Sequence, residues 1–246
     1  MGYNFFDKIY CINLKTRTDR YISAHKVFND LNIPNVEFYI TEKSSKGGRY
    51  GCFESHINVI KKAYNSGYNN ILIFEDDIRP SNLYNLKLLE HAIDFMKNNK
   101  YDIFYLGYLV FNYKYTIFNN TKINDNIIKY NPLGTHAYCL NKNSMIKILD
   151  IYNKYIDNIP VDEFYSLNIF NNYCLIPLIF EQDYCSTSDN DVKSILDFII
   201  HKSQCFFGNY LNIHSNMSYI IYNKKYVFFI CCFIYCFIFL KLINYI

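Results

Sequence analysis

Three consecutive acidic residues, Glu75, Asp76 and Asp77, follow directly on the apolar run of residues 71–74. A short apolar run that ends in polar residues is typical of a buried strand, so the carboxylates are expected at the strand's end. Carboxylates this close repel one another, and a bound cation relieves the repulsion. Mg²⁺ and Mn²⁺ prefer carboxylate oxygens and are commonly shared with substrate phosphates. The segment predicts a strand-end metal site that receives a diphosphate; the alternative is a solvated acidic turn before Pro80.

These residues need elements that bring them together, and the sequence alternates strand-like with helix-like segments. Expected strands cover residues 8–14, 36–40, 71–74, 102–106, 135–140 and 174–180. Expected helices run from Thr16 or Thr18 to 31, over 52–64, 83–96 and 144–155, and from 160 onward, with a hairpin or irregular insertion over 108–130. This order predicts an α/β domain whose mostly parallel mixed sheet is covered on both faces. Such sheets bind ligands at the carboxyl ends of their strands, so Asn13, which ends the first strand, is expected beside the acidic residues.

Length and composition fit one α/β domain, alone or with a small appendage: the chain has 246 residues, of which 51% are hydrophobic. The net charge of +3 is spread along the chain, and no basic run indicates a nucleic-acid partner. The nine cysteines form no CxxC pair and no spacing typical of a zinc site. We therefore expect buried free thiols in a reducing compartment.

An apolar-aromatic stretch begins at Tyr226 and is preceded by two lysines. Counted through residue 246 it has 21 residues, close to the ~20 that a membrane span needs. We expect residues 1–205 to form the main domain, 206–225 a connector and 226–246 a C-terminal apolar helix that anchors the chain in a membrane. The flanking lysines place the domain on the cytoplasmic side. The alternatives are a buried terminal helix or strand and a segment that dips into one leaflet; no secretory signal peptide is visible.

Four segments, in this order along the chain, resemble motifs of glycosyltransferase family 25, which includes lipooligosaccharide and collagen galactosyltransferases. Residues 9–20 resemble the family's opening INL-x-x-R-x-x-R, residues 51–56 its GC-x-x-SH element, and residues 73–77 its EDD motif. Residues 135–140 and 159–162 resemble a strand followed by a P-x-D helix start. One such segment would be weak evidence, whereas four in sequence are specific.

The resemblance implies a GT-A-like nucleotide-sugar-binding domain that transfers a hexose, galactose or glucose, from a UDP-sugar with inversion and with the help of Mn²⁺ or Mg²⁺. Glu75 and Asp77 are then the expected metal ligands, and the metal would neutralise the diphosphate leaving group. The two acids are separated by one residue, as in the DxD pattern of such enzymes, so one can face the metal while the other holds the ribose. Asp76 is expected in the same donor site, and Asn13 is expected to hydrogen-bond uracil or ribose.

The resemblance also assigns phosphate contacts to Arg17 and Arg20. They lie on the first turns of a helix, where the helix dipole and the guanidinium both favour phosphate. A solvated helix face is the alternative for both. Ser55 and His56, from the GC-x-x-SH element, are expected in the donor site, against the alternative that His56 is only a structural residue.

Inverting transfer needs a carboxylate that deprotonates the acceptor hydroxyl. Asp162 is the expected base, with Glu163 beside it, because Pro160 sets the start of the helix that presents them. The alternative is a plain N-terminal cap or dipole partner.

The acceptor stays open among a glycan, such as a lipopolysaccharide precursor, a lipid-linked sugar and a protein hydroxyl. Two rival functions also remain. One is a nucleotidyl- or phosphoryl-transferase that uses the same acidic metal turn. The other is a catalytically inactive glycosyltransferase-like protein that serves as a membrane-bound binding protein or scaffold.

Overall fold

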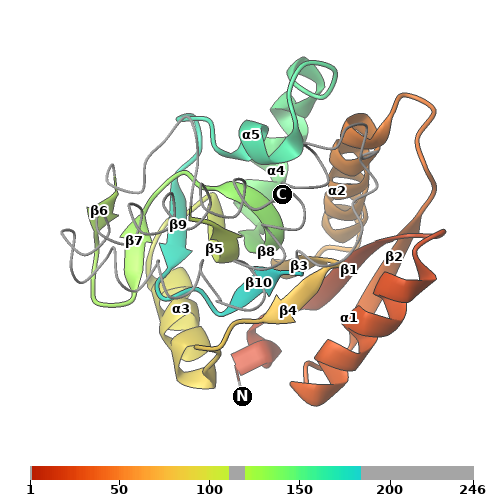
Figure 1. The fold of residues 1–246 in the computed structure, drawn as a ribbon. Coiled ribbons are helices and arrows are strands. Elements are labelled where there is room, and N and C mark those ends of the chain that lie inside the picture. Colours follow the sequence, from red (N-terminus) through yellow and green to blue (C-terminus); the bar gives the residue numbers. More distant parts are fainter. Residues whose placement is uncertain (1, 111–119, 184–246) are drawn as a thin grey trace, which may run out of the picture.

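The computed structural model describes residues 2–110 and 120–183, which form a layered α/β domain (Figure 1). Its helices are η1 (Gly2–Phe5), α1 (Thr18–Asp30), α2 (Gly48–Asn65), α3 (Leu86–Asn98), α4 (Lys142–Ile151), η3 (Tyr152–Lys154) and α5 (Val161–Tyr165). Its strands are β1 (Lys8–Leu14), β2 (Val36–Thr41), β3 (Asn70–Glu75), β4 (Ile78–Pro80), β5 (Ile103–Leu109), β6 (Thr121–Lys122), β7 (Ile127–Lys129), β8 (Leu133–Asn141), β9 (Asn172–Leu175) and β10 (Phe180–Gln182).

The main sheet has eight strands in the order β2-β1-β3-β8-β5-β9-β7-β6. The pairs β1–β2, β1–β3 and β5–β9 are parallel, and the strands β8 and β7 run antiparallel to both of their neighbours. Six of the eight strands therefore point the same way. The mostly parallel mixed sheet expected from the sequence is confirmed for the described residues.

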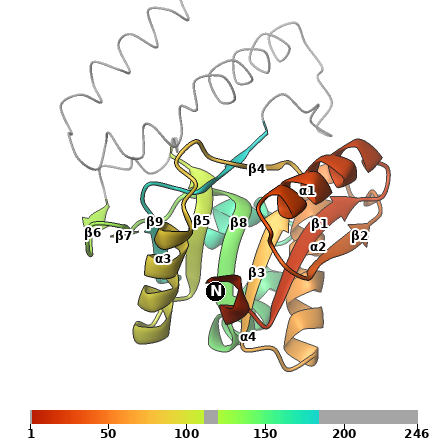
Figure 2. The same cartoon turned by 90° about the horizontal axis from the view of Figure 1, so that it is seen from below.

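Alternating side chains on β1 and β3 build a separate core on each face of this sheet. Ile9 and Cys11 pack with Leu72 and Phe74 against α1 and α3, while the intervening residues pack against α2, α4 and α5. The helices accordingly cover both faces, α1 and α3 below the sheet in Figure 1 and α2, α4 and α5 above it, and Figure 2 shows the same layers from below.

One expected strand is wrong in its extent. Residues 174–180 form two strands, because β9 ends at Leu175 in the main sheet and β10 begins at Phe180. Pro177 lies between them and lacks the N–H that a continuous ladder would require. β10 pairs instead with β4, a three-residue strand directly after the acidic residues that the sequence pattern did not indicate.

Among the cysteines of the described part, Cys11, Cys139 and Cys174 are buried free thiols, as expected, while Cys52 is exposed. No helix within residues 2–110 and 120–183 combines the length and apolarity needed to cross a membrane. The apolar stretch of 226–246 lies outside the described residues, so the anchor remains a prediction.

Candidate active site

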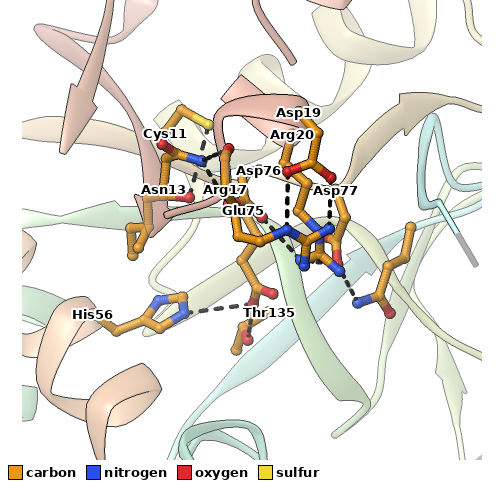
Figure 3. Close-up of polar contacts among 12 residues, drawn as sticks. Cys11, Asn13, Arg17, Asp19, Arg20, His56, Glu75, Asp76, Asp77 and Thr135 are labelled. Carbon is orange, nitrogen blue, oxygen red and sulfur yellow. Dashed lines mark hydrogen bonds and ion pairs between the residues drawn. The ribbon is translucent and has the colours of Figure 1, made fainter. Parts of the chain in front are cut away.

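The carboxyl ends of β1 and β3 lie side by side, and this brings Asn13 against the acidic residues. Ile12 pairs with Glu75 in the parallel register of the two strands. The Asn13 side-chain amide is buried and donates to Asp76 Oδ2 at 2.7 Å and to the Arg17 carbonyl at 3.1 Å (Figure 3). The expected meeting of these residues at one sheet edge is confirmed. The amide nitrogen already makes two bonds within the protein, and Asn13 is not among the residues that line the cavity described below.

Arg20 supplies a cation to two of the three acids. Its Nη1 lies 3.0 Å from Asp76 Oδ1 and 3.2 Å from Asp77 Oδ2. Arg17 is engaged elsewhere: its guanidinium donates to both carboxylate oxygens of Asp19, at 3.0 and 2.8 Å. Both arginines that the sequence assigned to phosphate thus hold carboxylates of the protein. Arg20 still lines the cavity described below, whereas Arg17 is not part of its described wall.

Asp77 is the most strained of the acids electrostatically. Burial and the neighbouring Glu75 charge raise its pKa to about 7, although Arg20 and a 2.8 Å hydrogen bond from Gln182 act in the opposite direction. Its Oδ1 atom is buried and has no hydrogen-bond partner within the described residues. A buried acceptor without a partner is costly, so Asp77 is poised to bind a cation or a hydrogen-bond donor.

Glu75 has the opposite balance. Burial alone would raise its pKa, but His56 and the hydroxyl of Thr135 lower it to about 2. Thr135 donates to Glu75 Oε1, and His56 Nε2 lies 3.4 Å from the same oxygen. Glu75 is therefore held as a carboxylate, with both contacts on one oxygen.

His56 and Ser55 both lie on α2 and line the cavity. His56 is fully buried, and its Nδ1 is 2.8 Å from the Tyr138 hydroxyl. The Ser55 hydroxyl is bonded within the protein, to the Gly51 carbonyl at 2.7 Å and to Thr41 Oγ1 at 3.1 Å. Their hydrogen bonds therefore hold both side chains to other residues of the protein, which supports the wall of the cavity.

Asp162, in the first turn of α5, lines the cavity too. Its carboxylate accepts hydrogen bonds from the Glu163 N–H at 2.9 Å and the Gly134 N–H at 3.4 Å. Burial raises its pKa, offset in part by these two amides. Glu163 is not among the residues of the described wall, so the two neighbouring acids differ in access to the cavity.

The cavity that collects these residues has a volume of about 670 Å³. Glu75, Asp76 and Asp77, here called the acidic wall, form one of its sides. The exposed side chains of Lys43 and Arg49, here called the basic wall, reach it from the loop before α2 and from the first turn of α2. The described contacts include no ion pair for either cation. A cavity with these two walls can take a ligand of drug-like size that carries negative charge.

The family model for glycosyltransferase family 25, described as an LPS biosynthesis protein, matches residues 36–165, which is slightly more than half of the chain. This chain belongs to glycosyltransferase family 25. The matched region contains α2 with its GC-x-x-SH element, the acidic wall and the Asp162 turn. The family assignment and the resemblance noted in the sequence therefore agree.

No curated protein matches this glycosyltransferase. Three solved structures are similar over most of its length. Protein A197 from STIV has 13% sequence identity and a TM-score of 0.38, with coverage of 68% of this chain and 81% of that one. A protein named as a glucose-1-phosphate thymidylyltransferase from Bacillus anthracis, in complex with a sucrose, has 11% identity and a TM-score of 0.39, with coverage of 80% of this chain and 75% of that one. A nucleoside-diphosphate-sugar pyrophosphorylase from Vibrio cholerae RC9 has 13% identity and a TM-score of 0.36, with coverage of 70% of this chain and 74% of that one.

Several site residues of the family 25 domain were not expected from the sequence. They are the side chains that hold or face the acidic wall from distant segments: Lys43, Arg49, Thr135, Tyr138 and Gln182. Arg49 directly follows the glycine pair of residues 47–48 and Lys43 lies four positions before it, which is a local signal of a loop that carries cations. The other three contact the site only through long-range packing of β8 and β10, which no local pattern shows.

The donor set leaves room for a divalent cation. Of the six oxygens of the acidic wall, Asp77 Oδ1 is buried without a partner, and the contacts to Glu75 all fall on Oε1. Mg²⁺ is commonly held by one or two carboxylates together with substrate phosphates. Within the described residues no cluster of three or more His, Cys, Asp or Glu side chains is arranged to hold a metal by itself. The acidic wall fits a metal shared with a ligand rather than one held by the protein alone.

Proposed function

We propose that this family 25 glycosyltransferase moves a hexose, galactose or glucose, from a UDP-sugar to an acceptor hydroxyl with inversion, through a GT-A-like nucleotide-sugar site. The observation that carries the proposal is the pairing of the two walls in one cavity. The acidic wall ends a parallel strand, where α/β sheets bind nucleotides, and the basic wall faces the same space.

The diphosphate belongs at the basic wall. Arg17 and Arg20 are occupied by carboxylates of the protein, whereas Lys43 and Arg49 line the cavity with no described ion pair. Phosphate oxygens are strong acceptors for both side chains. The first turn of α2 adds unpaired backbone N–H groups and a favourable dipole, since Gly47 at its N-cap has no side chain.

Glu75 and Asp77 would hold a divalent cation through Glu75 Oε2 and Asp77 Oδ1. When bound, Mn²⁺ or Mg²⁺ supplies positive charge to the departing diphosphate. Arg20 keeps Asp76 and Asp77 fixed meanwhile, and Asn13 holds Asp76 from the other side. Asn13 is buried and does not line the described cavity, so it acts on the donor site through Asp76.

Asp162 takes the part of the general base. It receives the proton of the acceptor hydroxyl while the acceptor oxygen forms its bond to C1 of the hexose. The bond from C1 to the diphosphate oxygen breaks, and UDP leaves with that electron pair. Burial favours proton uptake by Asp162, and the two backbone amides orient its carboxylate.

The family's description as an LPS biosynthesis protein supports a saccharide acceptor on a lipid carrier; a free glycan and a protein hydroxyl are the other acceptor classes. A lipid-bound acceptor would agree with a membrane anchor over residues 226–246 and a domain that faces the cytoplasm. The full chain should then resist carbonate extraction from membranes, and a chain that ends at Asn223 should be soluble and active. Release of the full chain by carbonate would overturn the anchor.

The experiment that tests the function is a screen of UDP-hexoses with the full chain, with and without Mn²⁺ or Mg²⁺, in which the nucleotide product is identified. Formation of UDP together with a glycosylated acceptor supports hexosyl transfer. Formation of UMP or pyrophosphate instead would support the nucleotidyltransferase alternative. Binding of UDP without turnover of any sugar would support an inactive binding protein.

A further inference from the structure

A chain of polar side chains runs from the acidic wall into the core of the domain. Glu75 Oε1 lies 3.4 Å from His56 Nε2, His56 Nδ1 lies 2.8 Å from the Tyr138 hydroxyl, and that hydroxyl lies 3.4 Å from the hydroxyl of Tyr165. His56, Tyr138 and Tyr165 are fully buried. They come from α2, β8 and α5, so three separate elements contribute to a chain that ends at one oxygen of Glu75.

The bond directions in this chain follow from the chemistry of its members. A buried phenol keeps its proton, and burial raises the pKa of Tyr138 well above its usual value. Glu75 is a carboxylate that can only accept, so a neutral imidazole that faces it with Nε2 carries its proton there. The Tyr138 O–H then donates to His56 Nδ1, while its oxygen accepts from Tyr165. An imidazole whose Nδ1 accepts carries its proton on Nε2, the atom that faces Glu75. The Nε2 atom has no fully formed hydrogen bond in the structure, and such contacts commonly tighten when a ligand binds.

We propose that Tyr138 is a positioning residue: it keeps His56 in the Nε2–H tautomer, so that the imidazole N–H holds Glu75 Oε1 and leaves Oε2 turned to the cavity. Thr135 donates to the same Oε1 and supports this orientation. The consequence for the sugar donor rests on the proposed function, because it requires Glu75 to contact the bound UDP-sugar or its metal. The tautomer itself does not depend on it.

Tyr105 offers a matched control. Its ring lies 6.4 Å from that of Tyr138 and is equally buried, on the neighbouring strand β5. Its hydroxyl has no hydrogen-bond partner within the described residues. Tyr105→Phe therefore removes the same atom from the same core without breaking the chain to Glu75.

The first measurement is the histidine ¹⁵N spectrum of the full chain at pH 7.5, with the His56 signals assigned by their loss in His56→Gln. We expect the Nε2–H tautomer in wild type and in Tyr105→Phe, and a mixture of tautomers in Tyr138→Phe. The second measurement is calorimetric titration with UDP in the presence of Mn²⁺. We expect about fivefold weaker binding for Tyr138→Phe, the size of one hydrogen bond, and no change for Tyr105→Phe.

An Nδ1–H tautomer or a doubly protonated His56 in wild type at pH 7.5 would overturn the proposal, whatever the activity of the protein. An unchanged tautomer in Tyr138→Phe would overturn it as well. If wild type binds no UDP, the proposed function fails, and the tautomer measurement alone decides the part of Tyr138. If wild type binds UDP, and Tyr138→Phe shifts the tautomer of His56 without weakening UDP binding, the proposed link from His56 to the sugar donor is wrong.

Discussion

The two walls of the cavity differ in how their charges are balanced. Every acid of the acidic wall has partners from elsewhere in the chain: Asn13 and Arg20 on Asp76, Arg20 and Gln182 on Asp77, and Thr135 and His56 on Glu75. The cations of the basic wall have none among the described contacts. Glu42, the acid next to Lys43, is itself paired with Lys15 at 2.8 Å.

The difference indicates that the fold itself fixes the acidic wall, whereas the charges of the basic wall are balanced only when a ligand binds. Fixed partners from several elements hold the acidic wall in one geometry before any ligand binds, which lowers the cost of binding. The basic wall keeps its charge uncompensated and exposed, so an anion gains more there than at arginines that already hold carboxylates. On this account, the negative charge that pairs with Lys43 and Arg49 is supplied by the ligand.

The largest effect is expected at Asp77, where the acidic wall has its unpartnered oxygen. Asp77→Ala should reduce transfer to an undetectable level and remove the response to Mn²⁺, while the melting temperature changes little because Asp77 holds no apolar core. Asp76→Asn is the comparison, since its oxygens are taken by Asn13 and Arg20. Transfer near the wild-type rate in Asp77→Ala would remove it from the site.

The next effect is expected at the general base. Asp162→Asn keeps the shape of the side chain and one of its two backbone contacts, because an amide NH2 cannot accept from an N–H. UDP should still bind, while transfer falls by about 10²–10⁴-fold. Glu163→Gln is the matched control, because Glu163 does not line the described cavity, and it should be nearly neutral. Equal losses of UDP binding and transfer in Asp162→Asn would move this residue to the donor site.

A smaller effect concerns His136, which is buried beside the acidic wall. Burial lowers its pKa from 6.5 to about 4, against the opposing influence of Glu75. Between these values the unfolded chain binds a proton that the folded chain does not, so this group's contribution to stability is present above pH 6.5 and is lost as the pH falls toward 4. The loss amounts to about 2 kcal/mol between pH 7 and pH 4.5.

Denaturant unfolding at several pH values measures this contribution. His136→Gln should flatten the pH dependence of the unfolding free energy by that amount relative to wild type. An NMR titration of wild type supplies an independent check if the variant does not fold. A His136 signal that titrates near pH 6.5 would contradict the expected neutral state.

The smallest effect is expected for one cation of the basic wall. Arg49→Ala should weaken UDP binding about fivefold at low salt and less at high salt, because an exposed phosphate contact is screened. Lys46→Ala is the matched control from the same segment, since Lys46 is 3.8 Å from Asp157 and stacks on Tyr50. Equal effects of the two substitutions would show that only the general charge of the segment matters.

The sequence predicted the parts of the fold that local patterns encode. The strand ends that carry Asn13 and Glu75 were found because apolar runs end there, and their meeting follows from parallel pairing. The split between β9 and β10 was missed because residues 174–180 are nearly all apolar and the break that Pro177 marks was not weighed; the pairing of β10 with β4 shows where the second strand lies.

The site was predictable in its residue types and less so in its pairings. The sequence assigned Arg17 and Arg20 to phosphate but could not show that Asp19, Asp76 and Asp77 occupy them. Competition for a charged partner depends on distances between segments, which spacing along the chain does not give. The same limit hid Gln182, which reaches Asp77 from more than one hundred positions away.

The most direct measurement is a calorimetric comparison of UDP with uridine, in wild type and in the double variant Lys43→Ala and Arg49→Ala, with Mn²⁺ present. We expect wild type to bind UDP at least a hundredfold more tightly than uridine. In the double variant this ratio of affinities should fall at least tenfold, while the affinity for uridine stays the same. Equal preference for UDP in both proteins would contradict the assignment of the diphosphate to the basic wall. Equal affinity of wild type for UDP and uridine would contradict a diphosphate site in this cavity.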